Sequence, residues 1–67
     1  MMSKNATRVL ALVEKNVDDF VKELKNPIEN VAIKLALNAG IPITRKELSD
    51  DDFILSCLKI LLDNKSA

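Results

Sequence analysis

Apolar residues recur along the first third of the chain at alternating spacings of four and three. This pattern is typical of one face of an α-helix, which completes a turn about every 3.6 residues. It predicts a helix over residues 6–24, with Ser3 or Asn5 available to cap its start. The residues of this stripe are Ala6, Leu10, Val13, Val17, Phe20 and Leu24, and Val9 and Val21 widen it.

A second helix is predicted over residues 27–39 by signals at both of its ends. Asn26 offers a capping side chain, Pro27 suits the first helical position, and Glu29 can complete a capping box. Gly40 predicts the end of this helix, because glycine readily takes the left-handed conformation that follows a last helical turn.

The segment after Gly40 predicts a change of direction before the last helix. Pro42 disfavours helical geometry for the residue before it, so residues 41–43 should be extended. Thr44 and Glu47 have the spacing of a capping box, which predicts a single helical turn at 44–48.

A last helix is predicted over residues 50–63. Ser49 is expected to cap it, and three aspartates follow at the partially positive helix N-terminus. The chain ends, 1–4 and 64–67, are expected to fray. The sequence therefore predicts a single all-α domain over residues 1–67, with three helices or with four if the turn at 44–48 is counted.

The last predicted helix carries more apolar surface than a small bundle can cover. At about 100° per residue its apolar arc spans roughly 220°, against roughly 100° for an ordinary surface helix. A chain of this size buries only about 60% of its unfolded surface, and monomers rarely expose large apolar patches. We therefore expect a symmetric homodimer or higher oligomer, unless the first helix and residues 41–43 cover both flanks of the last helix. The predicted interface residues are Ile33, Leu37, Leu55, Leu58 and Leu62.

The residue types present disfavour catalysis and metal binding. There is no histidine, no tyrosine and a single cysteine, so neither a disulfide nor a zinc-type site is expected. Cys57 lies among apolar helix neighbours and is interpreted as a buried, unreactive thiol. Residues 50–52 are consecutive aspartates, which splay by about 100° each on a helix and do not converge on one ion. No glycine-rich phosphate loop or acid pair is found, and no enzyme activity or cofactor is predicted.

Charge and hydropathy bear on partners and location. Ten basic and ten acidic residues give a net charge of zero, so no overall field attracts nucleic acid or an anionic membrane. The apolar run Val9–Val13 is too short for a signal-peptide core or a membrane span. A lone free cysteine suits a reducing compartment. These observations predict a cytoplasmic protein that has no membrane partner.

A dimeric nucleic-acid-binding regulator is the alternative function. Residues 35–41 look like the first helix and turn of a helix-turn-helix motif. Against this, Lys46 and Ser49 stand where a recognition helix would place apolar anchors, and the aspartates that follow would repel phosphate. The candidate basic patch consists of Lys4, Arg8, Arg45 and Lys46.

Part of the chain resembles the helical Nif-type leader domains of precursor peptides. The resemblance lies in Phe20, Leu24, residues 35–36, residues 39–41 and the segment 43–48. It covers less than half of the chain and implies a domain that modifying enzymes recognise and that precedes a cleaved core peptide. The sequence has no double-glycine cleavage site, and its last helix lies where processing would begin. A leader or carrier domain is therefore the third interpretation.

By elimination, the sequence favours a small non-catalytic protein–protein interaction module. Such a module would present a helical surface to itself and to another protein, as an adaptor, regulator or inhibitor. The partner protein is not identified by any motif in the sequence.

Overall fold

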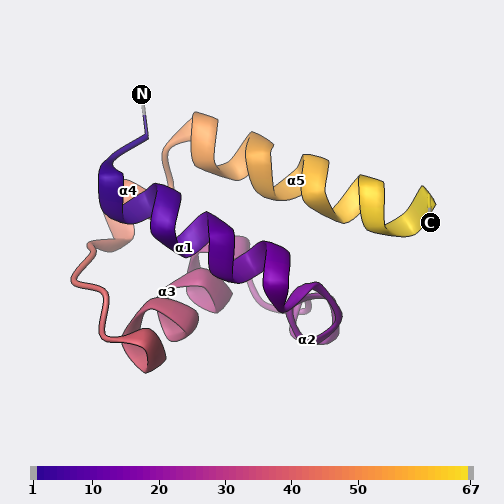
Figure 1. The fold of residues 1–67 in the computed structure, drawn as a ribbon, viewed down its shortest axis with the longest axis horizontal. Helices are drawn as coiled ribbons and strands as arrows, with labels where there is room; N and C mark the ends of the chain where they lie inside the picture. Colours follow the sequence, from indigo (N-terminus) through magenta and orange to yellow (C-terminus); the bar gives the residue numbers. More distant parts are fainter. Residues whose placement is uncertain (1, 67) are drawn as a thin grey trace.

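The computed structural model describes residues 2–66, and these residues form five helices and no strand. They are α1 (Lys4–Lys15), α2 (Val17–Lys22), α3 (Ile28–Ala39), α4 (Arg45–Leu48) and α5 (Asp51–Ser66). Helix α1 packs between α5 and α3, and α2 crosses near the C-terminal half of α5 (Figure 1). The radius of gyration is 10.8 Å, which matches the roughly 11 Å of a compact chain of this length. The predicted all-α class is confirmed. Within the described range, no helix combines the length and hydropathy needed to cross a bilayer.

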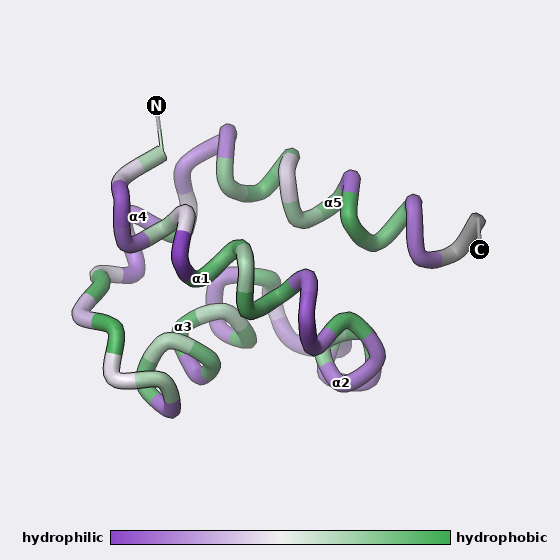
Figure 2. The backbone as a smooth tube through the Cα atoms, in the orientation of Figure 1, coloured by the Kyte–Doolittle hydropathy of each residue, from purple (hydrophilic) through white to green (hydrophobic). Residues whose placement is uncertain are grey.

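The core is formed by apolar residues from every helix. Hydrophobic and hydrophilic residues alternate along α1 with a helical period, as Figure 2 shows, and its hydrophobic positions include the buried Val9 and Val13. Phe20, Leu48 and Phe53 are the largest side chains in the core, and they come from α2, α4 and α5. The other buried residues are Ala6, Val31, Ala32, Ala36, Ile41 and Cys57.

The helix predicted over residues 6–24 is interrupted at Asn16, so this prediction was wrong in its continuity. The Asn16 side-chain amide donates to the Leu12 carbonyl at 2.8 Å, and the Asn16 backbone N–H also donates to that carbonyl at 3.0 Å. Asparagine competes in this way with the regular backbone ladder, which explains its low helix propensity. The chain therefore turns after α1, and α2 brings Phe20 into the core.

The predicted caps of the second helix were right at one end. Gly40 ends α3 with a φ of 71°, in the left-handed region, as expected. At the start, Pro27 is the N-cap residue rather than the first helical residue, and no side chain caps the helix. The Asn26 amide instead donates to the Glu23 carbonyl at 3.4 Å, because the preceding segment turns tightly.

The start of α5 also differs from the prediction. The Asp50 carboxylate accepts from the Asp52 N–H at 2.8 Å and so caps the helix. The predicted cap, Ser49, donates instead to the Lys46 carbonyl. At the other end, α5 extends to Ser66, three residues beyond the predicted end of the helix. Helix α1 likewise begins at Lys4, and Ser3 caps it by accepting from the Ala6 N–H at 3.1 Å. Residues 1 and 67 lie outside the described part of the chain.

Helix α4 is the predicted turn at 44–48, and its capping box is formed. Thr44 and Glu47 exchange both hydrogen bonds of the box. The Ser3 hydroxyl donates to Glu47 Oε2 at 2.7 Å, which ties the start of α1 to α4. Asn5 makes a second link, because its amide donates to the Pro42 carbonyl at 2.8 Å.

These bonds predict an acid-sensitive link between α1 and α4. The hydrogen bond from Ser3, helped by those from Thr44, lowers the pKa of the Glu47 carboxyl below its ordinary 4.5. A lowered pKa in the folded state stabilises the fold above pH 4.5, and this contribution is lost as the pH falls through the folded-state pKa. We expect Ser3→Ala to move the Glu47 pKa back toward 4.5 in an NMR titration, whereas Ser49→Ala should leave it unchanged. A wild-type Glu47 that titrates at 4.5 would contradict the hydrogen bonds described here.

Candidate interaction surface

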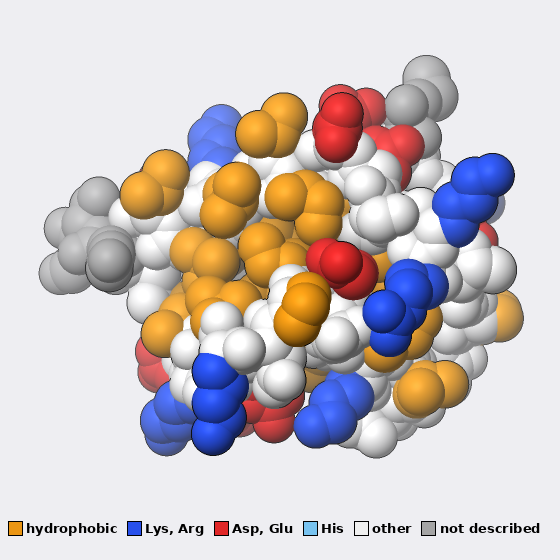
Figure 3. All heavy atoms as spheres, turned by 180° about the vertical axis from the view of Figure 1, so that it is seen from behind, with side chains coloured by type: hydrophobic (Ala, Val, Ile, Leu, Met, Phe, Trp, Pro, Cys, Tyr) orange, Lys and Arg blue, Asp and Glu red, His pale blue; other side chains and the backbone are white. Residues whose placement is uncertain are grey.

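An apolar groove lies between α2 and the C-terminal half of α5. Its volume is about 460 Å³. All but one of the lining side chains are aliphatic, and the exception is polar and uncharged. The lining residues are Val21, Leu24, Leu58, Leu61, Leu62 and Asn64. Seen from behind, hydrophobic side chains form a continuous area on this face (Figure 3).

The break at Asn16 is what builds this groove. Past the break, α2 runs for only six residues and ends in successive tight turns, in which the Leu24 N–H donates to the Val21 carbonyl at 3.2 Å. In such turns, side chains three residues apart lie one above the other. Val21 and Leu24 therefore form one wall of the groove, opposite the leucines of α5.

The groove exposes large side chains that a monomer would normally cover. The exposed fractions are 45% for Val21, 42% for Leu58 and 64% for Leu62. Leu55 is also exposed, at 63%, and it precedes Leu58 by one helical turn on the same stripe of α5. Together these four residues form the apolar face.

The residues predicted for the interface do not all lie together. Leu58 and Leu62 line the groove and Leu55 extends its face, but Ile33 lies in a different hollow, lined also by Arg45 and Lys34. Leu37 is 73% exposed near the end of α3 and does not line the groove. The predicted interface residues of α3, Ile33 and Leu37, therefore do not line the same groove as those of α5.

Three residues that line the groove, Val21, Leu24 and Leu61, were not among the predicted interface residues. Val21 and Leu24 were assigned to a continuous first helix, and Leu61 is partly buried beside them. The signal that could have found them is Asn16, because an asparagine inside an apolar stripe marks a place where the helix can turn.

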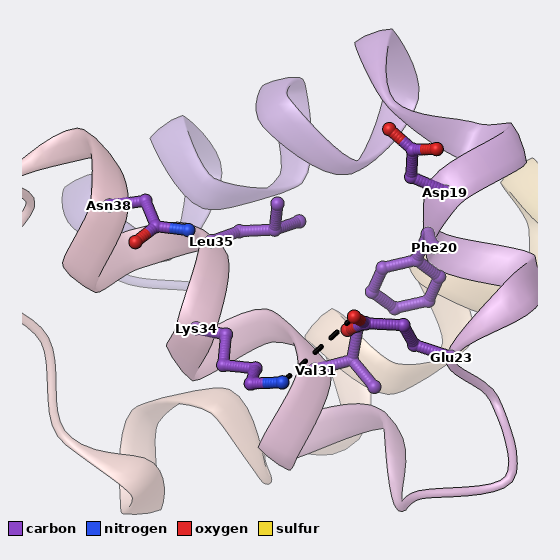
Figure 4. A pocket seen from close by; sticks show the side chains of 7 residues that line it. All are labelled: Asp19, Phe20, Glu23, Val31, Lys34, Leu35 and Asn38. Atoms are coloured by element: carbon purple, nitrogen blue, oxygen red, sulfur yellow. Dashed lines mark ion pairs between the residues drawn. The ribbon is translucent and has the colours of Figure 1, made fainter.

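A further hollow lies between α2 and α3, and both apolar and charged side chains line it. It has a volume of about 220 Å³, and Phe20, Val31 and Leu35 form its apolar part (Figure 4). Glu23 and Lys34 form an ion pair across it at 3.9 Å, and both side chains are exposed. Exposed pairs contribute little to stability, and this one places opposite charges over the hollow. An apolar partner would therefore meet a polar rim here, unlike in the groove beside α5.

The candidate basic patch is distributed over two helices. Lys4 and Arg8 lie four residues apart on α1, and the Arg8 guanidinium donates to Asn5 at 3.5 Å. Arg45 and Lys46 lie on α4, where Arg45 lines the hollow that contains Ile33. The next helix after the helix-turn-helix-like stretch at residues 35–41 is α4, which has only four residues. A recognition helix that spans a major groove needs more length than this single turn.

Neither a metal-binding cluster nor an ionised thiol is found in the described part of the chain. No group of three or more cysteine, aspartate and glutamate side chains there is placed to hold a metal ion. Cys57 is fully buried, and burial raises the pKa of its thiol to about 12. A thiol with such a pKa is protonated at neutral pH and is a poor nucleophile.

Comparisons with known proteins do not place the chain in a class. No family model, curated protein or solved structure matches it significantly. The interpretation of its function therefore depends on its own surface.

Proposed function

We propose that this chain is a small non-catalytic protein–protein interaction module that acts as a symmetric homodimer. Its role would be that of an adaptor, regulator or inhibitor that presents a helical surface. The observation that carries this proposal is the apolar face of Val21, Leu55, Leu58 and Leu62, which borders a groove on a chain of only 67 residues. Contiguous apolar surface of this kind marks interaction sites on soluble proteins.

The free energy available from burying this face is comparable with the cost of association. Full burial of a leucine contributes about 1.5–3 kcal/mol, so the exposed half of each side chain contributes about 1 kcal/mol. Two copies would bury eight such side chains, for a gross gain of about 8 kcal/mol. The loss of translational and rotational freedom costs about 4–15 kcal/mol. We therefore expect a dimer that dissociates on dilution and that needs polar contacts in addition to the apolar ones.

The buried, protonated thiol supports the non-catalytic part of this proposal. The one thiol, Cys57, is buried with a raised pKa, and histidine is absent from the sequence. A free thiol also fits a reducing compartment, so we propose the cytoplasm as the location.

Sedimentation velocity at tens of micromolar tests the proposal. We expect a species of about twice the 7.4 kDa chain mass, and we expect Leu62→Asp to return it to the monomer, because a buried carboxylate would face the apolar groove. Leu37→Asp is the matched control, since Leu37 is an even more exposed helical leucine outside the groove.

The two variants also separate assembly from folding. Both should keep the helix content of the wild type in far-UV circular dichroism, because both replace exposed side chains. A wild-type chain that sediments as a compact 7.4 kDa monomer at these concentrations would overturn the proposal. Dissociation by Leu37→Asp alone would assign the interface to α3 instead.

A further inference from the structure

We infer that the groove between α2 and α5 is filled by Leu55 of a second copy of this chain, whose α5 lies antiparallel to the first. This inference rests on the proposed function and adds the occupant of the groove and its orientation. The two-fold axis crosses α5 near residues 58 and 59, so each copy inserts Leu55 beside the partner's Leu62.

The spacing along α5 supports this arrangement. Leu55, Leu58 and Leu62 follow one another at intervals of three and four, which makes a single seam of the kind that paired helices bury. Leu55 is 63% exposed and does not line the groove, whereas Leu62 does. They are seven residues apart, or about 10 Å along the helix axis. An antiparallel copy centred between them places each exposed leucine over the other copy's groove, which a self-complementary two-fold interface requires.

Charge selects the antiparallel orientation over the parallel one. Asp51 begins α5 and lies one turn before Leu55 on the same stripe. At the other end of the face, Lys22 and Lys25 directly follow the groove residues Val21 and Leu24, and both lysines are exposed. In Figure 3, acidic side chains gather near one end of the hydrophobic area, and both basic and acidic side chains lie along its lower border.

Two other acidic residues near this basic end, Glu23 and Asp63, line other hollows than the groove. Glu23 pairs with Lys34 across the hollow between α2 and α3. Asp63 lines another hollow with Lys59 and Val17, on the flank of α5 that faces the first two helices. An antiparallel partner therefore brings its Asp51 to Lys22 and Lys25. A parallel partner would bring two copies of Asp51, and two positive helix ends, against each other.

A charge-exchange experiment tests the orientation. One variant is Asp51→Lys, and the other is the double variant Lys22→Glu/Lys25→Glu. Alone, each puts like charges at both ends of the antiparallel dimer, so we expect self-association about tenfold weaker than in the wild type. Mixed in equal amounts, the two variants form a heterodimer with opposite charges at both ends. At one end the new lysine at position 51 meets the two new glutamates, and at the other end the native Asp51 meets the native Lys22 and Lys25. The mixture should recover an affinity within about threefold of the wild type.

Two controls make the result specific. Lys4→Glu changes the charge at the start of α1, away from the groove, and should leave the affinity unchanged. Added salt should weaken the wild-type dimer and strengthen the self-association of each charge variant, since it screens attraction and repulsion alike. Native mass spectrometry of the mixture, with one variant labelled with ¹⁵N, identifies the heterodimer directly.

The outcomes separate this inference from the proposed function. If the wild type is a monomer, both are overturned. If the wild type is a dimer that Leu62→Asp dissociates but the charge variants associate normally, the interaction surface stands and the antiparallel arrangement is overturned. Weakening by each variant without recovery on mixing also overturns the antiparallel arrangement.

Discussion

Replacement of Phe53 by alanine is expected to remove most of the chain's stability. Phe53 is fully buried near the start of α5 and is one of the largest side chains in the core. Truncation of a buried phenylalanine to alanine costs about 3–5 kcal/mol, because the transfer free energy is lost and a cavity remains. A chain of 67 residues has a total stability of about 3–10 kcal/mol. The Phe53→Ala chain should therefore be partly or largely unfolded.

Urea unfolding followed by circular dichroism measures this loss. Leu37→Ala is the control, because Leu37 is 73% exposed and its truncation should cost less than about 0.5 kcal/mol. Both variants should be compared at one protein concentration, since dimerisation would make the midpoint depend on concentration. If Phe53→Ala unfolds at the same urea concentration as Leu37→Ala, the core described here is wrong.

Local signals predicted several elements of this fold accurately. The Thr44–Glu47 capping box and the left-handed Gly40 both formed where the sequence placed them. Each depends on residues only a few positions apart, so the chemistry is complete within the local sequence. The apolar stripe of α1 also identified Val9 and Val13 as core residues.

The features that sequence reasoning missed depend on competition or on distant contacts. Asn16 lies within an apolar stripe whose period favours a helix, yet the helix is interrupted there and the Asn16 amide bonds to the Leu12 carbonyl. At the start of α5, the predicted cap Ser49 bonds back to Lys46 of α4, and the Asp50 carboxylate caps the helix. Periodicity gives the faces of each helix but not which faces meet.

The candidate surface was predicted in part for the same reason. The excess of apolar residues on α5 is visible in the sequence, and Leu55, Leu58 and Leu62 are indeed exposed. The second wall of the groove required the turn after α1, which brings Val21 and Leu24 beside α5. Leu37 looked equivalent to these residues in the sequence, but only the three-dimensional arrangement separates it from them.

Cys57 is expected to react with iodoacetamide at least about a thousandfold more slowly in the folded chain than in the unfolded chain. The thiol is fully buried among core residues of α5 and its neighbours. Burial raises its pKa from 9.0 to about 12, so the reactive thiolate is about a thousandfold scarcer at any pH below 9. Steric protection within the core adds to this effect.

The reaction would therefore report on opening of the whole core. If alkylation requires unfolding, its rate should rise in Phe53→Ala, which weakens the core, and stay at the wild-type value in Leu37→Ala. Because the pKa of Cys57 is higher in the folded chain, ionisation of this thiol does not affect the free energy of unfolding below pH 9.0. As the pH rises from 9.0 toward 12, the unfolded chain loses the thiol proton more readily, and the fold becomes less stable. Cys57→Ala should lack this alkaline loss while showing a core-truncation cost of about 1–3 kcal/mol. Equal alkylation rates for the folded and urea-unfolded wild type would contradict the buried position of Cys57.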